Sequence, residues 1–196
     1  MPDDPPSPAL PLQPTEIAAG TLQLRVWEPA FLPAVLIALT DPEIRTWNPL
    51  RKAADSHLDD DALAAAWIER RSAWDGEHAT WAVCDAVSGN VLGYVSLHDL
   101  NPTHRSGEVG YWVLPAARNH GVGRRAVAAA CRYGFGALGL HRIELFHAVE
   151  NVASCRVAEG AGFLFEGISR QAYRYGDDIF HDDHNHARLA SDPDPR

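Results

Sequence analysis

The residues at 118–126, RNHGVGRRA, are spaced so that they could hold a phosphate group. They satisfy two patterns at once: Gly-x-Gly-x-x-Ala, found in dinucleotide-binding folds, and Arg-x-x-Gly-x-Gly, which suggests a different phosphate cradle. In both patterns glycines let main-chain N–H groups converge on the anion, and a helix that begins near Val122 adds the positive end of its dipole. An isolated match can also come from glycines that only shape a loop. Other features of the sequence are therefore needed to choose among these three interpretations.

The distribution of charge supports an anion near these glycines. The chain has 196 residues and a formal net charge of −9. Between Glu108 and Glu144 there is nevertheless no Asp or Glu, and five arginines occur there: Arg118, Arg124, Arg125, Arg132 and Arg142. The overall acidity argues against a nucleic-acid partner, because neutralising phosphates requires a basic face. It makes a cationic substrate easier to accommodate.

The order of the elements argues against a dinucleotide fold. In such a fold the glycine fingerprint follows the first strand directly, and an acid about 20 residues later holds a ribose. Glu144 satisfies that distance. However, Pro115 ends the preceding strand, a loop separates it from Gly121, and only one further strand-helix pair follows. Two mononucleotide-binding halves do not fit this order.

Two stretches resemble the GNAT superfamily of acyl-CoA-dependent N-acyltransferases, specifically its ribosomal-protein N-terminal (Rim-type) branch: GEVGYWVLPAARNHGVGRRAV and NVASCRVAEGAGFLFEG. The resemblance covers residues 21–189. It implies a GNAT fold of the α+β class, with a mixed, mostly antiparallel central sheet that is splayed between its fourth and fifth strands and flanked by helices. It also implies acetyl-CoA as acyl donor, with no metal, and assigns the glycines to its pyrophosphate.

The resemblance further implies which residues meet the cofactor. Main-chain groups near Val113 and Leu114 would be free, where the strands separate, to bond the pantetheine arm, and one N–H could polarise the thioester carbonyl. Residues 118–123 would contact the diphosphate through main-chain amides, so several of them would act through their conformation. The expected cofactor-binding residues are Val113, Leu114, Arg118, Asn119, His120, Gly121, Val122, Gly123, Arg124 and Asn151.

Attack on a thioester needs a neutral amine, a base for its proton and a donor for the departing thiolate. Glu108 is the candidate base, directly or through water, because it begins the central strand and matches the acidic position of this branch. Without the resemblance it would read as a solvated carboxylate. Ser154 is the candidate donor, one turn into the helix that starts at Asn151, although it could instead bond only the helix backbone.

Other side chains with chemical potential have weaker assignments. Where the wider superfamily often has a tyrosine acid, this chain has Ala158; Tyr173 or Tyr111 could substitute. Cys155 is adjacent to Ser154 and points elsewhere on the helix, which disfavours an acyl-cysteine. Trp47 could form a wall of the substrate cleft, with Tyr111 as a second substrate-binding candidate.

A histidine-rich segment near the C-terminus raises a metal hypothesis. It is FHDDHNH, at residues 180–186, and offers five potential ligands: His181, Asp182, Asp183, His184 and His186. Successive side chains on a strand alternate faces, so the five cannot all converge. The prediction is therefore that no metal binds.

The elements that position these residues follow from hydrophobic patterning and turn signals. A strand is expected at 21–29, then helices at 31–40 and 59–74 with a loop at 41–49 between them, and a hairpin around 88–90. The second half should contain a strand at 108–115, helices at 123–138 and from 151, a strand at 142–149 and two closing strands at 163–189. We expect a disordered Pro-rich tail at 1–15, one domain at 16–190 and a flexible C-terminus at 191–196.

The predicted function is acetyl transfer to a primary amine, with a protein N-terminal α-amine as one candidate acceptor. The pKa of an α-amine, about 7.7 to 8.0, leaves roughly a quarter of it neutral at pH 7.4, against about a thousandth of a lysine amine. Alternatives are a small-molecule amine acceptor, succinyl-CoA as donor, a non-catalytic acyl-CoA-binding module, and a nucleotide-dependent oxidoreductase. A homodimer is an open expectation.

The expected location is the cytoplasm, with no membrane partner. The apolar run AFLPAVLIAL is shorter than the roughly 18 residues of a membrane span. Cys84, Cys131 and Cys155 are odd in number and widely spaced, which is typical of thiols in a reducing compartment.

Overall fold

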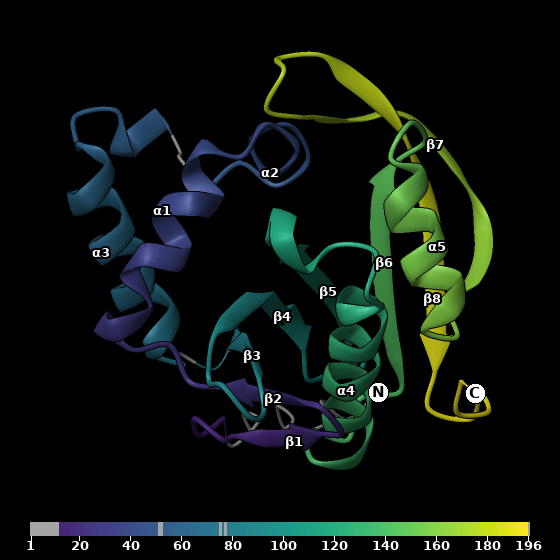
Figure 1. Ribbon diagram of the computed structural model, residues 1–196. Helices are drawn as coiled ribbons and strands as arrows, with labels where there is room; N and C mark the ends of the chain where they lie inside the picture. Colours follow the sequence, from purple (N-terminus) through teal and green to yellow (C-terminus); the bar gives the residue numbers. More distant parts are fainter. Residues whose placement is uncertain (1–11, 51–52, 75, 77, 196) are drawn as a thin grey trace, which may run out of the picture.

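The computed structural model describes residues 12–50, 53–74, 76 and 78–195 (Figure 1). Its strands form one sheet in the order β1-β2-β3-β4-β5-β6-β8-β7. Neighbouring strands are antiparallel except β5 and β6, which run parallel. The prediction of a mixed, mostly antiparallel α+β sheet is confirmed.

The strands are β1 (Ile17–Ala19), β2 (Leu22–Arg25), β3 (Ala79–Asp85), β4 (Val91–Asn101), β5 (Ser106–Val113), β6 (Arg142–Ala148), β7 (Leu164–Arg174) and β8 (Phe180–Leu189). The helices are α1 (Leu32–Thr40), α2 (Pro42–Trp47), α3 (Asp60–Ser72), α4 (Val122–Gly136) and α5 (Val152–Gly160). The first strand was predicted at 21–29, which is too long. In the structure this strand is β2, which ends at Arg25 and pairs with the additional short strand β1.

The predicted loop at 41–49 was wrong, because most of it forms α2. Asp41 caps this helix: its side-chain oxygen accepts a hydrogen bond from the Ile44 N–H at 2.9 Å. Pro42 occupies the first helical position, where the missing N–H costs nothing. Helix α3 was predicted correctly, and Asp59 caps it in the same way through the Ala62 N–H.

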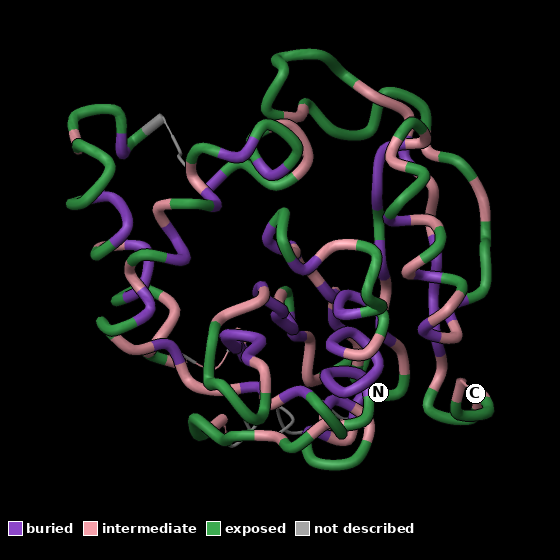
Figure 2. The backbone as a smooth tube through the Cα atoms, viewed as in Figure 1, coloured by how far each residue is buried: buried purple, intermediate pink, exposed green. Residues whose placement is uncertain are grey.

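Helices cover both faces of the sheet. Helices α4 and α5 contribute to one apolar cluster, and α1, α2 and α3 to a second on the other face. Figure 2 shows the buried segments on the central strands and on α4. Trp27, Trp67 and Trp112 pack against one another in the second cluster, with the rings of Trp27 and Trp67 edge to face at 4.8 Å. All three tryptophans are core residues.

The two ends of the chain are partly attached to the domain. Residues 1–11 of the predicted disordered tail lie outside the described residues. Leu12 packs against the core, and the Thr15 carbonyl accepts a hydrogen bond from the Trp81 indole at 2.7 Å. Near the other end, the buried guanidinium of Arg188 donates to Asp194 at 2.7 Å, so this part of the predicted flexible C-terminus contacts the fold. Among the helices described, none has the length and apolar character needed to cross a bilayer.

Candidate active site

The sheet splits between β5 and β6. The two strands pair only at Ser106–Arg142, Gly107–Ile143 and Glu108–Glu144, and then separate. They are the fourth and fifth strands of the predicted order, since β1 is the additional one. A cleft of about 390 Å³ occupies the split, lined by the C-terminal half of β5, the start of α4, β6, α5 and α2. The predicted position of the splay is confirmed.

Main-chain groups of β5 face the cleft at alternate residues. The Leu114 N–H donates to the Leu92 carbonyl on the β4 side at 2.9 Å. In an antiparallel strand the neighbouring residue therefore turns its N–H and C=O the other way. Accordingly, the Asn48 amide donates to the Tyr111 carbonyl at 3.0 Å and the Arg118 Nε donates to the Val113 carbonyl at 3.2 Å.

This alternation corrects the assignment of Leu114. Its N–H is bonded to Leu92, and its carbonyl accepts from the Ala117 N–H at 2.9 Å. Neither group is free for a pantetheine arm. The cleft-facing main chain belongs to Tyr111 and Val113, and contact of Val113 with the arm stays a prediction.

The glycine loop leads directly into α4. Asn119 and Gly121 have left-handed φ angles of 61° and 69°, and α4 begins at the next residue, Val122. The first main-chain hydrogen bond into the helix runs from the Arg125 N–H to the Gly121 carbonyl. The N–H groups of the three preceding residues have no carbonyl one turn earlier in the helix, which is the arrangement that binds anions.

Gly123 allows close packing at this point. A Cβ atom there would lie 3.2 Å from Cε2 of Tyr111 and 3.4 Å from side-chain carbons of Val113 and Val157. A larger residue would require the Tyr111 ring or the start of α4 to shift by a few tenths of an ångström or more. The glycine thus sets the distance between the helix N-terminus and the strand that lines the cleft.

The side chain of Arg118 points away from the glycine loop. It donates to Asp41 at 2.5 Å and forms an ion pair with Glu43 at 3.1 Å, and so ties α2 to the end of β5. Its main-chain N–H donates to the Pro115 carbonyl at 3.3 Å, so the predicted main-chain contact of Arg118 with the phosphate would have to replace that bond. His120 is exposed, lies outside the cleft lining and accepts a hydrogen bond at its carbonyl from Arg125.

The structure brings Tyr111 and Ser154 together. The Tyr111 hydroxyl donates to Ser154 Oγ at 3.0 Å, and both residues line the cleft. Asn151 caps α5: its side-chain oxygen accepts from the Ser154 N–H at 3.1 Å, so its side chain positions the serine. Burial raises the pKa of Tyr111 to about 12, so the phenol stays protonated at neutral pH. Tyr173, the other tyrosine considered, is exposed on β7.

Glu108 lies at the closed end of the split rather than in the cleft lining. Its carboxylate is grouped with His98 and Asp99, with the ligand atoms of the three within 4.8 Å of one another. Burial raises the pKa of Glu108, while the neighbouring His98 opposes that rise. A carboxylate with a raised pKa is a stronger base than a solvated one.

Aromatic residues form the wall opposite the glycine loop. The ring of Trp47 stands edge-on to Tyr175 at 5.5 Å and to His181 at 5.6 Å. The Tyr175 hydroxyl donates to Asp183 at 2.9 Å. Trp47 lines the cleft from the end of helix α2, and its contact with substrate stays a prediction. Sequence reasoning missed Tyr175 because the β7–β8 turn meets α2 only in the folded chain.

Comparison with known proteins identifies the family. Residues 21–164 match the family described as acetyltransferase (GNAT) domain. The Bacillus subtilis protein YdaF, named provisionally as a ribosomal N-acetyltransferase, is 37% identical over 98 residues, which are 48% of this chain and 51% of that protein. The spermidine N(1)-acetyltransferase of Vibrio cholerae is 35% identical over 85 residues, 43% of this chain and 49% of that protein.

The aligned region spans about half the length of these curated relatives. Among solved structures, the spermidine N-acetyltransferase from Vibrio cholerae in complex with CoA and spermine superposes with a TM-score of 0.72 at 25% identity. That match covers 88% of this chain and 97% of the other. Because the family match extends over well more than half of the sequence, the chain belongs to the GNAT acetyltransferase family.

Proposed function

We propose that the chain is an N-acetyltransferase that moves an acetyl group from acetyl-CoA directly to a primary amine in a ternary complex. One observation carries this proposal: a single cleft joins the start of α4, the cleft-facing main-chain N–H groups of β5 and the hydroxyl pair of Tyr111 and Ser154. These can receive, in that order, a pyrophosphate, a pantetheine arm and a thiolate. The family and a CoA complex among the similar structures support the same donor.

The hydroxyl pair is suited to stabilise the departing thiolate. Tyr111 gives its hydrogen to Ser154, which leaves the serine hydrogen free to point at the sulfur. Since the pKa of an ordinary thiol is about 8.5, complete proton transfer from a phenol of pKa about 12 is uphill. The pair therefore acts as a hydrogen-bond donor while the C–S bond breaks, and the Val113 N–H donates to the carbonyl oxygen as it becomes negative.

We assign the base to Glu108, acting through water. Glu108 and Gly110 lie on the same face of β5, and Gly110 lines the cleft. Residues two apart on a strand are separated by about 6.6 Å, and the His98 ring lies over Gly110 in this gap, with its Nε2 3.0 Å from where a Cβ atom would stand. The proton leaves the attacking nitrogen toward this carboxylate, which lies beside His98.

The acceptor that fits best is a peptide α-amine. The described cleft lining contains one carboxylate, that of Glu43, and it already pairs with Arg118. The same lining also contains the arginines Arg124 and Arg156. A polyamine carries several positive charges and would need several carboxylates in the cleft. A peptide N-terminus brings a single amine, and its neutral backbone can pack against the aromatic wall of Trp47 and Tyr175.

A panel of acceptors tests this assignment. Release of free CoA thiol is measured with acetyl-CoA and, in parallel, a short peptide with a free N-terminus, the same peptide with a blocked N-terminus and one lysine, and spermidine. We expect transfer only to the first peptide. Faster transfer to spermidine contradicts the acceptor. Thermal stabilisation by acetyl-CoA without transfer to any amine supports a non-catalytic binding module instead, and a preference for succinyl-CoA changes the donor.

The remaining expectations concern the location of the protein, its partners and its oligomeric state. Three unpaired cysteines support a reducing compartment such as the cytoplasm. The acidic net charge supports the absence of a nucleic-acid partner. A homodimer and the absence of a membrane partner stay predictions, which sedimentation and vesicle binding would check.

A further inference from the structure

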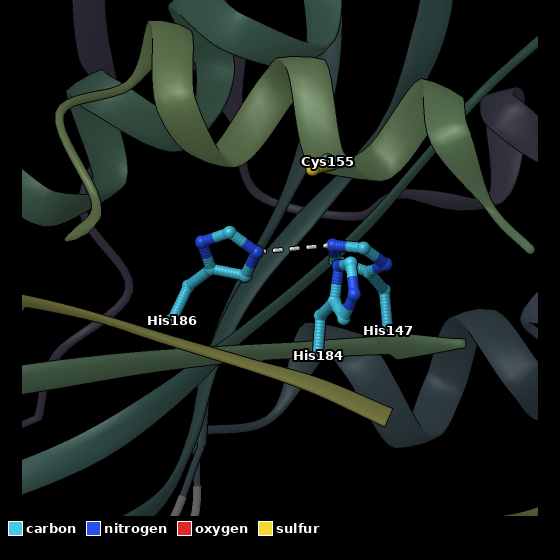
Figure 3. A group of neighbouring side chains, drawn as sticks. All are labelled: His147, Cys155, His184 and His186. Carbon is cyan, nitrogen blue, oxygen red and sulfur yellow. Dashed lines mark hydrogen bonds between the residues drawn. The ribbon is translucent and has the colours of Figure 1, made fainter. Parts of the chain in front are cut away.

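A cluster of three histidines and one cysteine lies between α5 and the sheet (Figure 3). His147 of β6 and His184 of β8 are paired across the two strands, and His186 follows two residues later on the same face. Cys155 faces them from α5. One ring nitrogen of each histidine and the sulfur of Cys155 all lie within 4.8 Å of one another.

Several ring nitrogens in this cluster have unused lone pairs or hydrogens. The Nδ1 of His147 lies 2.8 Å from the Ala148 carbonyl oxygen, which can only accept, so Nδ1 carries the hydrogen and Nε2 keeps a lone pair. That Nε2 lies 3.3 Å from the Nε2 of His186. Among the described residues, the buried Nδ1 atoms of His184 and His186 have no hydrogen-bond partner; the nitrogen of His186 that faces His147 is Nε2, so a ligand in the cluster could account only for the Nδ1 of His184. Buried polar atoms without partners are rare and call for an explanation.

The spacing of the donors agrees with a tetrahedral zinc ion. With Zn–N distances of about 2.0 to 2.1 Å, two nitrogen ligands of such a site lie about 3.3 to 3.4 Å apart. The two Nε2 atoms of His147 and His186 are already at 3.3 Å. A nitrogen and a thiolate sulfur would lie about 3.6 Å apart, so the remaining pairs, all within 4.8 Å, need side-chain movements of about 1 Å.

The chemistry of the donors selects the kind of metal. Imidazole and thiolate suit zinc, whereas magnesium and calcium take oxygen ligands. Burial lowers the pKa of His147 and of His186, so both rings stay neutral and able to donate a lone pair. The Cys155 thiol donates to Glu159 at 3.8 Å and has a raised pKa, so a bound metal would displace its proton. The Ala148 carbonyl orients the His147 ring, as outer partners of zinc ligands commonly do.

We propose that His147, Cys155, His184 and His186 form a zinc-binding site that fastens α5 to β6 and β8. Four protein ligands leave no open coordination position, which is typical of structural rather than catalytic zinc. Ser154 precedes Cys155 on α5 and faces the cleft, so the metal holds the helix that carries it. The site lies beside the cleft, because His147 also lines it, but the proposal does not depend on the proposed function.

Cobalt(II) is the probe for the test, because its spectrum reports both thiolate ligation and tetrahedral geometry. The full chain, without an affinity tag and stripped with a chelator, is titrated with cobalt and then with zinc. We expect one cobalt per chain, a thiolate-to-cobalt charge-transfer band, intense d–d bands, and loss of all bands when zinc is added. Zinc at about 100 times its dissociation constant should raise Tm by about 5 to 10 °C.

Variants locate the site. Cys155→Ser should abolish the charge-transfer band, and His184→Gln should remove the stoichiometric binding while circular dichroism of the metal-free chain stays unchanged. The matched control is His181→Gln, on the same strand but bonded to Glu150 and Asp177, which should keep both signals. The proposal is overturned if the parent chain shows no charge-transfer band, if Cys155→Ser retains it, or if only His181→Gln removes it. Should Cys155→Ser fail to fold, His184→Gln alone decides.

Discussion

At the scale of single residues, the candidate chemistry is divided between two places. The hydrogen-bonded hydroxyls of Tyr111 and Ser154 lie in the cleft, whereas Glu108 lies at its closed end beside His98 and Asp99. The hydroxyls that would donate a hydrogen bond to the thiolate thus lie in the cleft. The proposed base, Glu108, lies two residues along β5 from Gly110, which lines the cleft. The two roles should therefore respond differently to substitution and to pH.

Replacing Glu108 by Gln removes the proposed base and keeps the shape of the side chain. We expect kcat/KM to fall by about 100-fold, the usual size of a general-base contribution. The base works only when ionised, so activity of the parent enzyme should fall as pH drops through the raised pKa of Glu108, and this acidic limb should vanish in the variant. Rate profiles between pH 5 and 9 measure both effects. Glu69→Gln, on the exposed side of α3, is the control, and an unchanged Glu108→Gln profile would contradict the assignment.

The hydroxyl pair makes a separate prediction. A hydrogen bond to a charged group contributes about 1.5 to 3 kcal/mol, so Ser154→Ala and Tyr111→Phe should each lower kcat by about 10- to 100-fold. Because the two hydroxyls act as one donor, the double variant should lose little more than either single variant. Initial rates at saturating acetyl-CoA show this. Tyr173→Phe, which removes an exposed hydroxyl, should change nothing; fully additive losses would mean that the two hydroxyls work independently.

At the scale of elements, the position of α4 relative to β5 determines the phosphate site. Gly123→Ala would place a methyl group 3.2 Å from the Tyr111 ring, so the ring or the start of the helix must shift slightly. We expect the dissociation constant for acetyl-CoA to rise by about 10-fold, equivalent to about 1.4 kcal/mol. Gly136 ends the same helix, and a Cβ atom added there would meet no described atom within 4 Å, so Gly136→Ala should leave binding unchanged. Isothermal titration compares the two, and equal affinities would argue against this role of Gly123.

The elements also show how far the sequence could predict the molecule. The start of the helix near Asp59, the strand ending before Pro115 and the glycine loop before a helix are local signals, and the structure places all three as predicted. Helix α2 has only six residues, too few for a periodic pattern, and it is held by the contact of Arg118 with Asp41 from a distant part of the chain. Such contacts depend on tertiary packing, which local patterns do not encode.

The same limit applies to the site residues. Glu108, Ser154 and Val113 could be named from motifs, since each stands at a fixed distance from the glycine loop or the helix start. The meeting of Tyr111 with Ser154, or of His147 with His186, depends on how far β5 and β6 separate and on the register of β6 against β8. Alternation along the strand correctly predicted that the residues of the FHDDHNH segment would divide between faces. It could not predict that His147 and Cys155 would join two of them.

At the scale of the whole molecule, the cleft lies between two parts of one sheet that are joined by few contacts. Three residue pairs connect β5 to β6, and beyond them α4 and α5 share an apolar cluster. Arg142 reinforces the joined end through ion pairs with Glu144 at 2.8 Å and Glu166 at 2.5 Å. Stability and function are therefore linked here: whatever fastens β6, β8 and α5 also holds one wall of the cleft.

The buried histidines in that wall give the folding stability a defined pH dependence. His147 and His186 are only 3% and 1% exposed, and burial lowers the pKa of both rings below their ordinary value of 6.5. In the unfolded chain they take up protons near that pH, so below it the unfolded state binds more protons than the folded one. The free energy of unfolding must then fall as the pH decreases, by at most about 1.4 kcal/mol per pH unit for each ring.

We therefore expect the metal-free protein to lose stability between pH 7 and 5.5, measured by urea unfolding in the presence of a chelator. His181 acts in the opposite sense, because Asp177 and Glu150 raise its pKa, but exposed ion pairs of this kind contribute little. His186→Gln removes one of the two buried titrations and should reduce the slope by about half. His141→Gln, an exposed ring just before β6, should leave the slope unchanged. Equal slopes for the parent and His186→Gln would show that these rings are protonated in the folded protein as readily as in the unfolded chain.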